Sequence, residues 1–126
     1  MRPIAPNETA DQTGPIGARK LAQTPLVLSP PGTSTRMLLE QALAAVGVTP
    51  QIAVETAARE AIVPLALAGA GAALLPASLA SEAQRRGAII RRARPAITRT
   101  VGIVHRDGPL SAAARSFVEL ATNTGA

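Results

Sequence analysis

The chain has 126 residues, a length that suits one small domain able to bury roughly two-thirds of the surface that its unfolded chain would expose. Hydrophobic residues make up 47% of it but aromatic residues only 1%, so the core has to be built from alanine, leucine, isoleucine and valine. The absence of cysteine excludes disulfides and thiolate metal sites. A formal net charge of +5 is compatible with a nucleic-acid partner, because Lys and Arg neutralise phosphates.

The N-terminal region carries no targeting or membrane signal. No apolar run approaches the ~18 to 20 residues needed to span a bilayer, and the first 20 residues do not resemble a signal peptide. The sequence therefore predicts a cytoplasmic protein with no membrane partner. Residues 1–24 mix Pro and Gly with polar residues and lack a sustained period, which predicts a loosely held, partly disordered lead-in before a domain at 25–126.

Residues 25–47 predict a strand, a tight turn and a helix. An apolar run at 26–28 precedes the turn, Thr33 or Ser34 can cap the helix with its hydroxyl, and Gly47 offers a left-handed stop. A helix that begins directly after a strand, with hydroxyls beside its unpaired N–H groups, can bind a small anion. An ordinary capped structural helix stays open as the simpler interpretation.

Strands and helices alternate through the rest of the chain. This spacing implies βαβ units and a mostly parallel sheet with helices on both faces. Ligands of such sheets bind beyond the carboxyl ends of the strands, so the helix starts at 33–35 and 56–58 are expected to face one pocket. Further strands are expected at 51–55, 72–75, 88–92 and 100–106, and further helices after 56–58, at 77–86 and after Ser111.

Three of these elements carry more specific expectations. Pro64 should kink its helix without breaking it. The strand at 100–106 has an apolar centre that predicts cover on both faces. Ser111 should cap the last helix, whose expected buried stripe is Ala114, Phe117, Val118 and Ala121.

Positive charge is concentrated between residues 85 and 106, where no acidic residue intervenes. There is no Tyr or Trp to stack on a base, and no segment has the polar side chains of a recognition helix. We therefore expect a solvated face of a sheet and its flanking helix, and no specific DNA contact by this chain alone. The arginines concerned are Arg85, Arg86, Arg91, Arg92, Arg94, Arg99 and Arg106.

Signatures of catalysis are poor. The motifs of a nucleophile elbow, a phosphate-binding loop and a dinucleotide site each fail at a required glycine or lysine. His105 is the one histidine and has no nucleophile or acid arranged around it, so it is expected to be a structural or sheet-edge residue. Arg36 could pair with a ligand carboxylate or form an internal salt bridge, and both interpretations stay open. The sequence predicts no catalytic residue, no metal and no cofactor.

Four segments occur in a characteristic order: PLVLSPPGTSTR, IAVETAAREAI, LALAGAGAALLPASLA and TVGIVHRDGPLSAAARSFVEL. In this order and spacing the chain from about residue 14 to 120 resembles the C-terminal portion of the effector-binding domain of LysR-type transcriptional regulators. The resemblance implies a three-layer α/β/α fold of the periplasmic-binding-protein-like type 2 class. It also implies that residues 25–126 comprise the second subdomain plus a return strand and helix of the first.

The same resemblance implies binding of a small effector, a carboxylate or other anion, rather than a reaction. Counterparts of the family's winged helix-turn-helix and of the first half of its first subdomain are missing from this sequence, so DNA contact is expected only through an absent domain. Apolar edges that would face that missing part are expected to promote self-association. A non-transcriptional solute-binding domain, an enzyme such as a dehydratase on the same scaffold, and a truncated gene product stay open. The effector contacts expected are Thr33, Ser34, Thr35, Arg36, Thr56 and Ala57.

Overall fold

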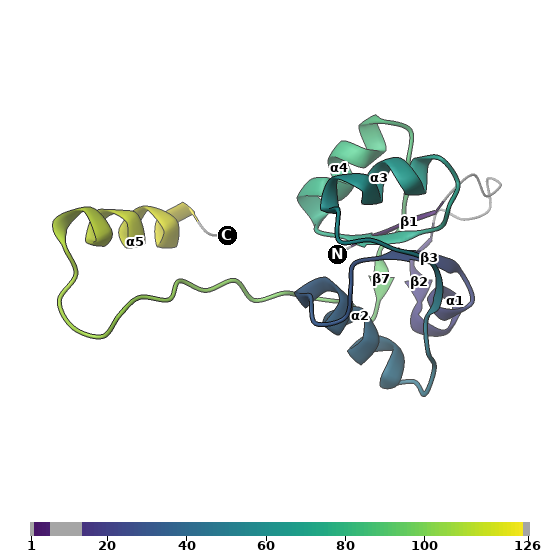
Figure 1. Ribbon diagram of the computed structural model, residues 1–126, viewed down its shortest axis with the longest axis horizontal. Coiled ribbons are helices and arrows are strands. Elements are labelled where there is room, and N and C mark those ends of the chain that lie inside the picture. The colour runs from purple at the N-terminus through teal and green to yellow at the C-terminus, as the bar shows by residue number, and fades with distance from the viewer. Residues whose placement is uncertain (1, 6–13, 125–126) are drawn as a thin grey trace.

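The structure is a computed structural model and describes residues 2–5 and 14–124, with side chains from residue 14 onward (Figure 1). In this described part, none of the helices combines the length and the apolar character that crossing a bilayer requires. The strands are β1 (Arg2–Ala5), β2 (Ile16–Gly17), β3 (Pro25–Leu28), β4 (Gln51–Glu55), β5 (Ala73–Leu75), β6 (Ile89–Ile90) and β7 (Ala93–Arg94). The helices are α1 (Ala18–Ala22), α2 (Ser34–Ala44), α3 (Arg59–Leu67), α4 (Ala77–Arg85) and α5 (Ala112–Thr124).

The strands pair in both directions. β3 runs parallel to β4, and β2 runs parallel to β7. A parallel bridge joins Leu26 of β3 to Ala72 just before β5, with the Val27 N–H 2.8 Å from the Ala72 carbonyl oxygen. β1 lies between β5 and β6 and is antiparallel to both. The expected parallel pairing thus holds for β3, β4 and β5, whereas β1 makes the sheet mixed.

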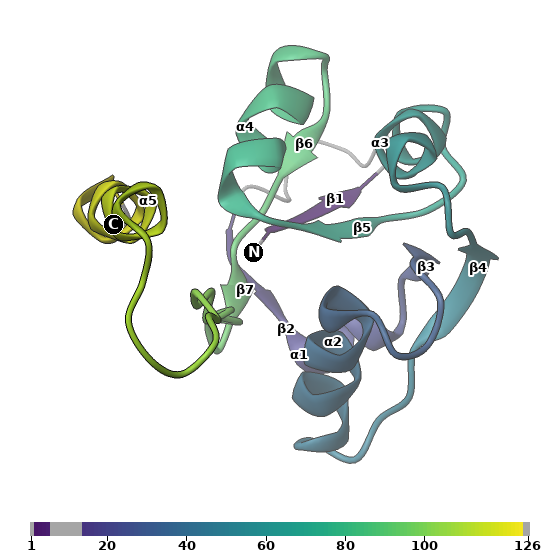
Figure 2. The same ribbon diagram turned by 60° about the vertical axis from the view of Figure 1, so that its left-hand side comes forward.

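Two hydrophobic cores lie on opposite faces of these strands. Figure 2 shows α3 and α4 on one side of β1 and β5, and α1 and α2 on the other. Alternate side chains of a strand point to opposite faces, so Leu74 packs in the core with α1 and α2, while Leu75 packs in the core with α3 and α4. This arrangement confirms the three-layer α/β/α architecture. The second core is small because alanines supply most of its buried members.

The predicted strand, turn and helix after residue 24 are confirmed by β3 and α2. Gly47 has φ +72°, the left-handed conformation expected of a helix stop. α3 is continuous across Pro64, and the Pro64 carbonyl accepts a hydrogen bond from the Ala68 N–H at 2.9 Å. The expected kink at Pro64 stays a prediction. α4 and β4 also begin at the predicted residues.

The lead-in is ordered where the structure describes it. β1 pairs inside the sheet, and Ile16 and Leu21 are buried in the core that also contains Leu26. This segment is ordered by strand pairing with distant residues and by burial of its apolar side chains. Neither of these can be recognised from the composition of residues 1–24. Residues 6–13, where disorder is expected, lie outside the described part, and the domain boundary between 24 and 25 stays a prediction.

The prediction of a long covered strand at 100–106 is wrong for this structure. Residues 95–111 contain no strand, and Val101 and Val104 are 78% and 96% exposed. A strand needs a hydrogen-bonding neighbour, and no part of the described chain pairs with this segment. Figure 1 shows it leading away from the layered body to α5.

The last helix forms but is not buried. The Ser111 Oγ accepts a hydrogen bond from the Ala114 N–H at 3.2 Å, which confirms the predicted cap. α5 contains no buried residue, and Phe117 is 65% exposed. The expected buried stripe is therefore wrong, because no residue of α5 is buried by the rest of the described chain. The amphipathic pattern correctly predicts that α5 is a helix, but the burial that it predicts for the apolar face of α5 is not found in the described structure.

Candidate functional site

A cavity of about 220 Å³ opens at one edge of the sheet. A single water needs roughly 10–15 Å³ measured in this way, so the cavity has room for a small organic molecule. β3 and β5 approach it with their carboxyl ends, and α2 and α4 begin beside it. Its lining residues are Val27, Leu28, Ser29, Ser34, Thr35, Arg36, Arg59, Ile62, Leu74, Leu75, Pro76, Leu79 and Arg99.

The position of the cavity follows from the parallel strands. β3 and β5 run in the same direction through the bridge at Leu26, so both carboxyl ends meet at one edge. This is the edge at which ligands of open α/β sheets bind. Most of the lining residues are apolar, and the others are three residues with hydroxyl groups and three arginines. No carboxylate of the described part of the chain lines the cavity. This mixture is typical of a small-molecule site.

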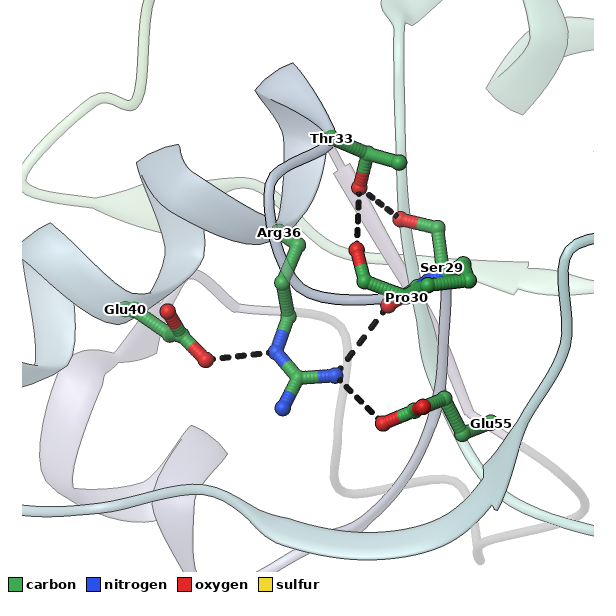
Figure 3. A network of polar contacts seen from close by, with 6 residues as sticks. All are labelled: Ser29, Pro30, Thr33, Arg36, Glu40 and Glu55. Atoms are coloured by element: carbon green, nitrogen blue, oxygen red, sulfur yellow. Dashed lines mark hydrogen bonds and ion pairs between the residues drawn. The ribbon is translucent and has the colours of Figure 1, made fainter.

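The turn between β3 and α2 is closed by side-chain hydrogen bonds (Figure 3). The Thr33 hydroxyl donates to the Pro30 carbonyl oxygen at 2.9 Å and lies 2.6 Å from the Ser29 Oγ. Thr33 occupies the N-cap position but makes no side-chain cap hydrogen bond, so the expected hydroxyl cap is wrong. Its hydroxyl is used inside the turn instead. In the described structure, the first-turn N–H groups of α2 consequently have no side-chain acceptor.

Arg36 is the buried charge behind this turn, with only 6% of its surface exposed. Its Nε donates to Glu40 Oε1 at 2.6 Å, and its Nη1 donates to Glu55 Oε2 and to the Ser29 carbonyl oxygen, both at 3.1 Å (Figure 3). Burial is the largest single influence and lowers the pKa of Arg36. The hydrogen bonds and charges of Glu40 and Glu55 together outweigh it, so the pKa is raised and the guanidinium stays charged. Of the two open interpretations of Arg36, the internal salt bridge is the one that the structure contains.

Two further arginines line the cavity and were missed by sequence reasoning. Arg59 is the first residue of α3, and Arg99 comes from the segment before α5. In the described part of the chain, neither side chain makes a hydrogen bond or an ion pair. Arg59 follows the predicted helix start at 56–58 closely enough to have been found. Arg99 lies in a different part of the chain, and no local pattern indicates its position.

The predicted contact residues are divided between the cavity and its surroundings. Ser34, Thr35 and Arg36 line the cavity, whereas Thr33, Thr56 and Ala57 do not. The Thr56 N–H donates to the Leu28 carbonyl oxygen at 2.9 Å, and the Thr56 Oγ1 accepts from the Ala58 N–H at 3.1 Å. These bonds order the approach to α3. The roles of all six residues in binding stay predictions.

The remaining charged candidates lie elsewhere. His105 is exposed in a coil, not at a sheet edge, and its Nδ1 lies 2.9 Å from the Arg106 carbonyl oxygen. Most arginines between 85 and 106 are exposed, as predicted, but Arg91 donates to the carbonyl oxygens of Gly14 and Pro15 at 2.8 and 3.0 Å. Among the described residues, no three His, Cys, Asp or Glu side chains gather as metal ligands would.

Comparison with known proteins agrees with this architecture. A family model described as the LysR substrate binding domain matches residues 1–126. Among solved structures, the effector binding domain of QuiR in complex with shikimate superposes with a TM-score of 0.66 and 18% sequence identity. The alignment covers 98% of this chain and 59% of that chain, and at this identity it shows the fold alone. A search of curated protein sequences found no significant match.

Proposed function

Because this chain belongs to the LysR substrate-binding domain family, we propose that it is the effector-binding part of a LysR-type regulator. Its ligand is a small organic anion, bound in the cavity at the carboxyl edge of β3 and β5. The observation that carries this proposal is the cavity itself, which is lined by hydroxyls and arginines and, among the described residues, by no carboxylate. A catalytic role is not part of the proposal. A cytoplasmic location and DNA binding through a separate domain are part of it, since regulators act on DNA.

The start of α2 supplies the polar end of this site. Ser34 and Thr35 line the cavity, and the first turn of α2 to which they belong has no side-chain cap hydrogen bond from Thr33. A helix end stabilises an anion by about 0.3 to 1 kcal/mol, reaching ~2 when partly buried. With a second contribution of similar size from the arginines, the total is roughly 4 kcal/mol, which corresponds to millimolar affinity. Weak binding is therefore expected from this chain.

Shikimate is a suitable first probe, because it is a hydroxylated cyclic carboxylate and is the ligand in the similar effector-binding domain. In an NMR titration to ~10 mM, several times the expected dissociation constant, amide shifts should concentrate on 33–36 and 56–58. Benzoate, sulfate and phosphate extend the series to other anions. Contacts from Thr33, Thr56 and Ala57 would appear in the same spectra.

A bulky substitution at the turn separates binding from general effects. Ser34→Leu should abolish the shifts because the side chain enters the cavity. Ser116→Leu, at an exposed position of α5, is the matched control and should leave them unchanged. If no anion moves the amides of 33–36, or if Ser34→Leu binds as well as the parent, the turn is only a helix start and the proposal is wrong.

The alternatives differ in what they require. An enzyme on this scaffold would turn over one of the anions in the series, and a solute-binding protein would bind it without any link to a promoter. Membership of the LysR family favours the regulator over both. Turnover of a bound anion, followed by NMR over hours, would favour the enzyme.

A further inference from the structure

We infer that Arg59 and Arg99, and not the buried Arg36, give this cavity its selectivity for anions. The effector is then an organic acid with an apolar body, and its charged group is attracted by Arg59 and Arg99 as well as by the start of α2. This inference rests on the proposed function, since it concerns the same cavity. It assigns specificity to two residues whose side chains are exposed and have no partner in the described structure.

The charge around Arg36 argues against this residue as the source of selectivity. One arginine is in contact with two glutamates, Glu40 and Glu55, so the cluster has a formal charge of +1 − 2 = −1. Glu40 of α2 and Glu55 at the end of β4 are 44% and 43% exposed, and Arg36 in the first turn of α2 holds both. Taken alone, this cluster weakens the attraction of an anion to the hydroxyl end of the cavity.

Arg59 and Arg99 change the formal charge around the cavity from negative to positive. They add two positive charges to the cavity lining, and the five groups together have a formal charge of −1 + 2 = +1. Removal of both would return the local charge to −1. Glu60 is adjacent to Arg59 in sequence but does not line this cavity. The sign of the potential that a ligand meets therefore depends on these two arginines.

The remaining lining defines the body of the ligand. Leu74, Leu75, Leu79 and Ile62 contribute apolar side chains to the same lining. Apolar groups gain free energy on burial there, whereas a small hydrated anion such as phosphate gains nothing from these side chains. A cyclic or branched monocarboxylate fits both features. Inorganic phosphate and acetate should bind less well than such an acid.

The test compares an acid with a neutral molecule of the same shape. Benzoate and benzamide are titrated into the full chain and into Arg59→Gln, Arg99→Gln and the double variant, with amide shifts as the readout. The double variant should bind benzoate about tenfold more weakly, since two partly exposed charge pairs are lost, and benzamide equally well. Arg92→Gln removes the same charge at an exposed residue outside the cavity and should change benzoate binding by less than about twofold.

The outcomes separate this inference from the proposed function. If benzoate shifts the amides of 33–36 but the double variant binds it as well as the parent, Arg59 and Arg99 are not the determinants, although the cavity binds anions. The same conclusion follows if Arg92→Gln weakens binding equally or if benzamide binds the parent as well as benzoate. If neither benzoate nor shikimate shifts those amides, the proposed function fails, and this inference fails with it. Far-UV circular dichroism of each variant shows that the fold is retained.

Discussion

Arg36 connects three elements through one buried side chain. It belongs to α2, it holds Glu55 of β4, and it donates to the carbonyl oxygen of Ser29 just after β3. A buried polar group that loses its partner costs about 1–3 kcal/mol. The two glutamates are half exposed and can regain water, which keeps the cost below that of a fully buried ion pair. The position of Arg36 is therefore important for stability first and for binding second.

Arg36→Met should lower the free energy of unfolding by about 1–3 kcal/mol. The substitution keeps an apolar stem of similar length but leaves the Ser29 carbonyl and two carboxylates without their donor. Urea unfolding followed by far-UV circular dichroism measures the change, because the chain has no Trp or Tyr for fluorescence. Arg92→Met, at an exposed residue, is the control and should unfold at the parent's urea concentration.

The dependence of this contribution on pH has a definite sign. The folded-state pKa of Arg36 is raised, so its contribution is complete at neutral pH and is lost only as the pH rises through that raised value. The difference between parent and Arg36→Met should consequently stay constant on the basic side of neutrality, from pH 7 to about 9. Equal stability of the two proteins at neutral pH would contradict the structural role.

At the scale of elements, the close approach of β3 and the start of β5 depends on Gly71. A Cβ added there would lie 2.7 Å from the Pro25 carbonyl oxygen and 3.1 Å from its carbon. Both are backbone atoms, and the same carbonyl accepts the Ala72 N–H at 2.8 Å. A side chain would therefore push the two strands apart. Because these strands end at the cavity, the packing of Gly71 also positions the candidate site.

Gly71→Ala should destabilise the protein by about 1–3 kcal/mol, the usual cost of overpacking a rigid site. Gly102→Ala is the matched control, since a Cβ at Gly102 meets nothing within 4 Å, and it should change stability by less than about 0.5 kcal/mol. Thermal or urea unfolding distinguishes the two. A Gly71→Ala protein as stable as the control would show that β3 and β5 separate without cost.

Elements with local signals could be predicted from the sequence, and elements that depend on distant partners could not. The apolar run, turn and periodic helix of β3 and α2 are contained in one continuous stretch, and their bounds agree with the prediction. β1 has four residues, and its partners β5 (Ala73–Leu75) and β6 (Ile89–Ile90) come much later in the chain, so its strand is determined by long-range pairing. The segment 100–106 shows the opposite case, in which a suitable pattern has no partner.

The same distinction between local features and distant partners applies to the candidate site. Ser34 and Thr35 were found because a helix start after a strand is a local feature with a known chemistry. The cavity also needs Arg99, which follows Ser34 by 65 residues and is brought beside it only by the fold. The sequence predicts a solvated face for Arg99, because composition alone does not distinguish a solvated arginine from one that lines a cavity.

At the scale of the whole molecule, the layered body and the C-terminal segment differ in how they are packed. The body buries its leucines in two cores, whereas the segment and α5 expose large apolar side chains. Val104 is 96% exposed, and Phe117 and Leu120 are 65% and 68% exposed. Exposed side chains of this size, gathered on one segment, favour association with another apolar surface.

We therefore predict that the chain forms dimers or larger species in solution. Burial of Val104, Phe117 and Leu120 between copies would remove apolar surface from water, at about 25 cal/mol for each Å². Light scattering at ~100 μM, where weak association is detectable, should give a mass above that of one chain. The double variant Val104→Gln and Phe117→Gln should shift the protein toward monomer. Ser116→Gln, an exposed polar position on the same helix, should not. A monodisperse monomer at that concentration, or a double variant that associates as strongly as the parent, would show that these side chains tolerate water and that the segment does not mediate self-association.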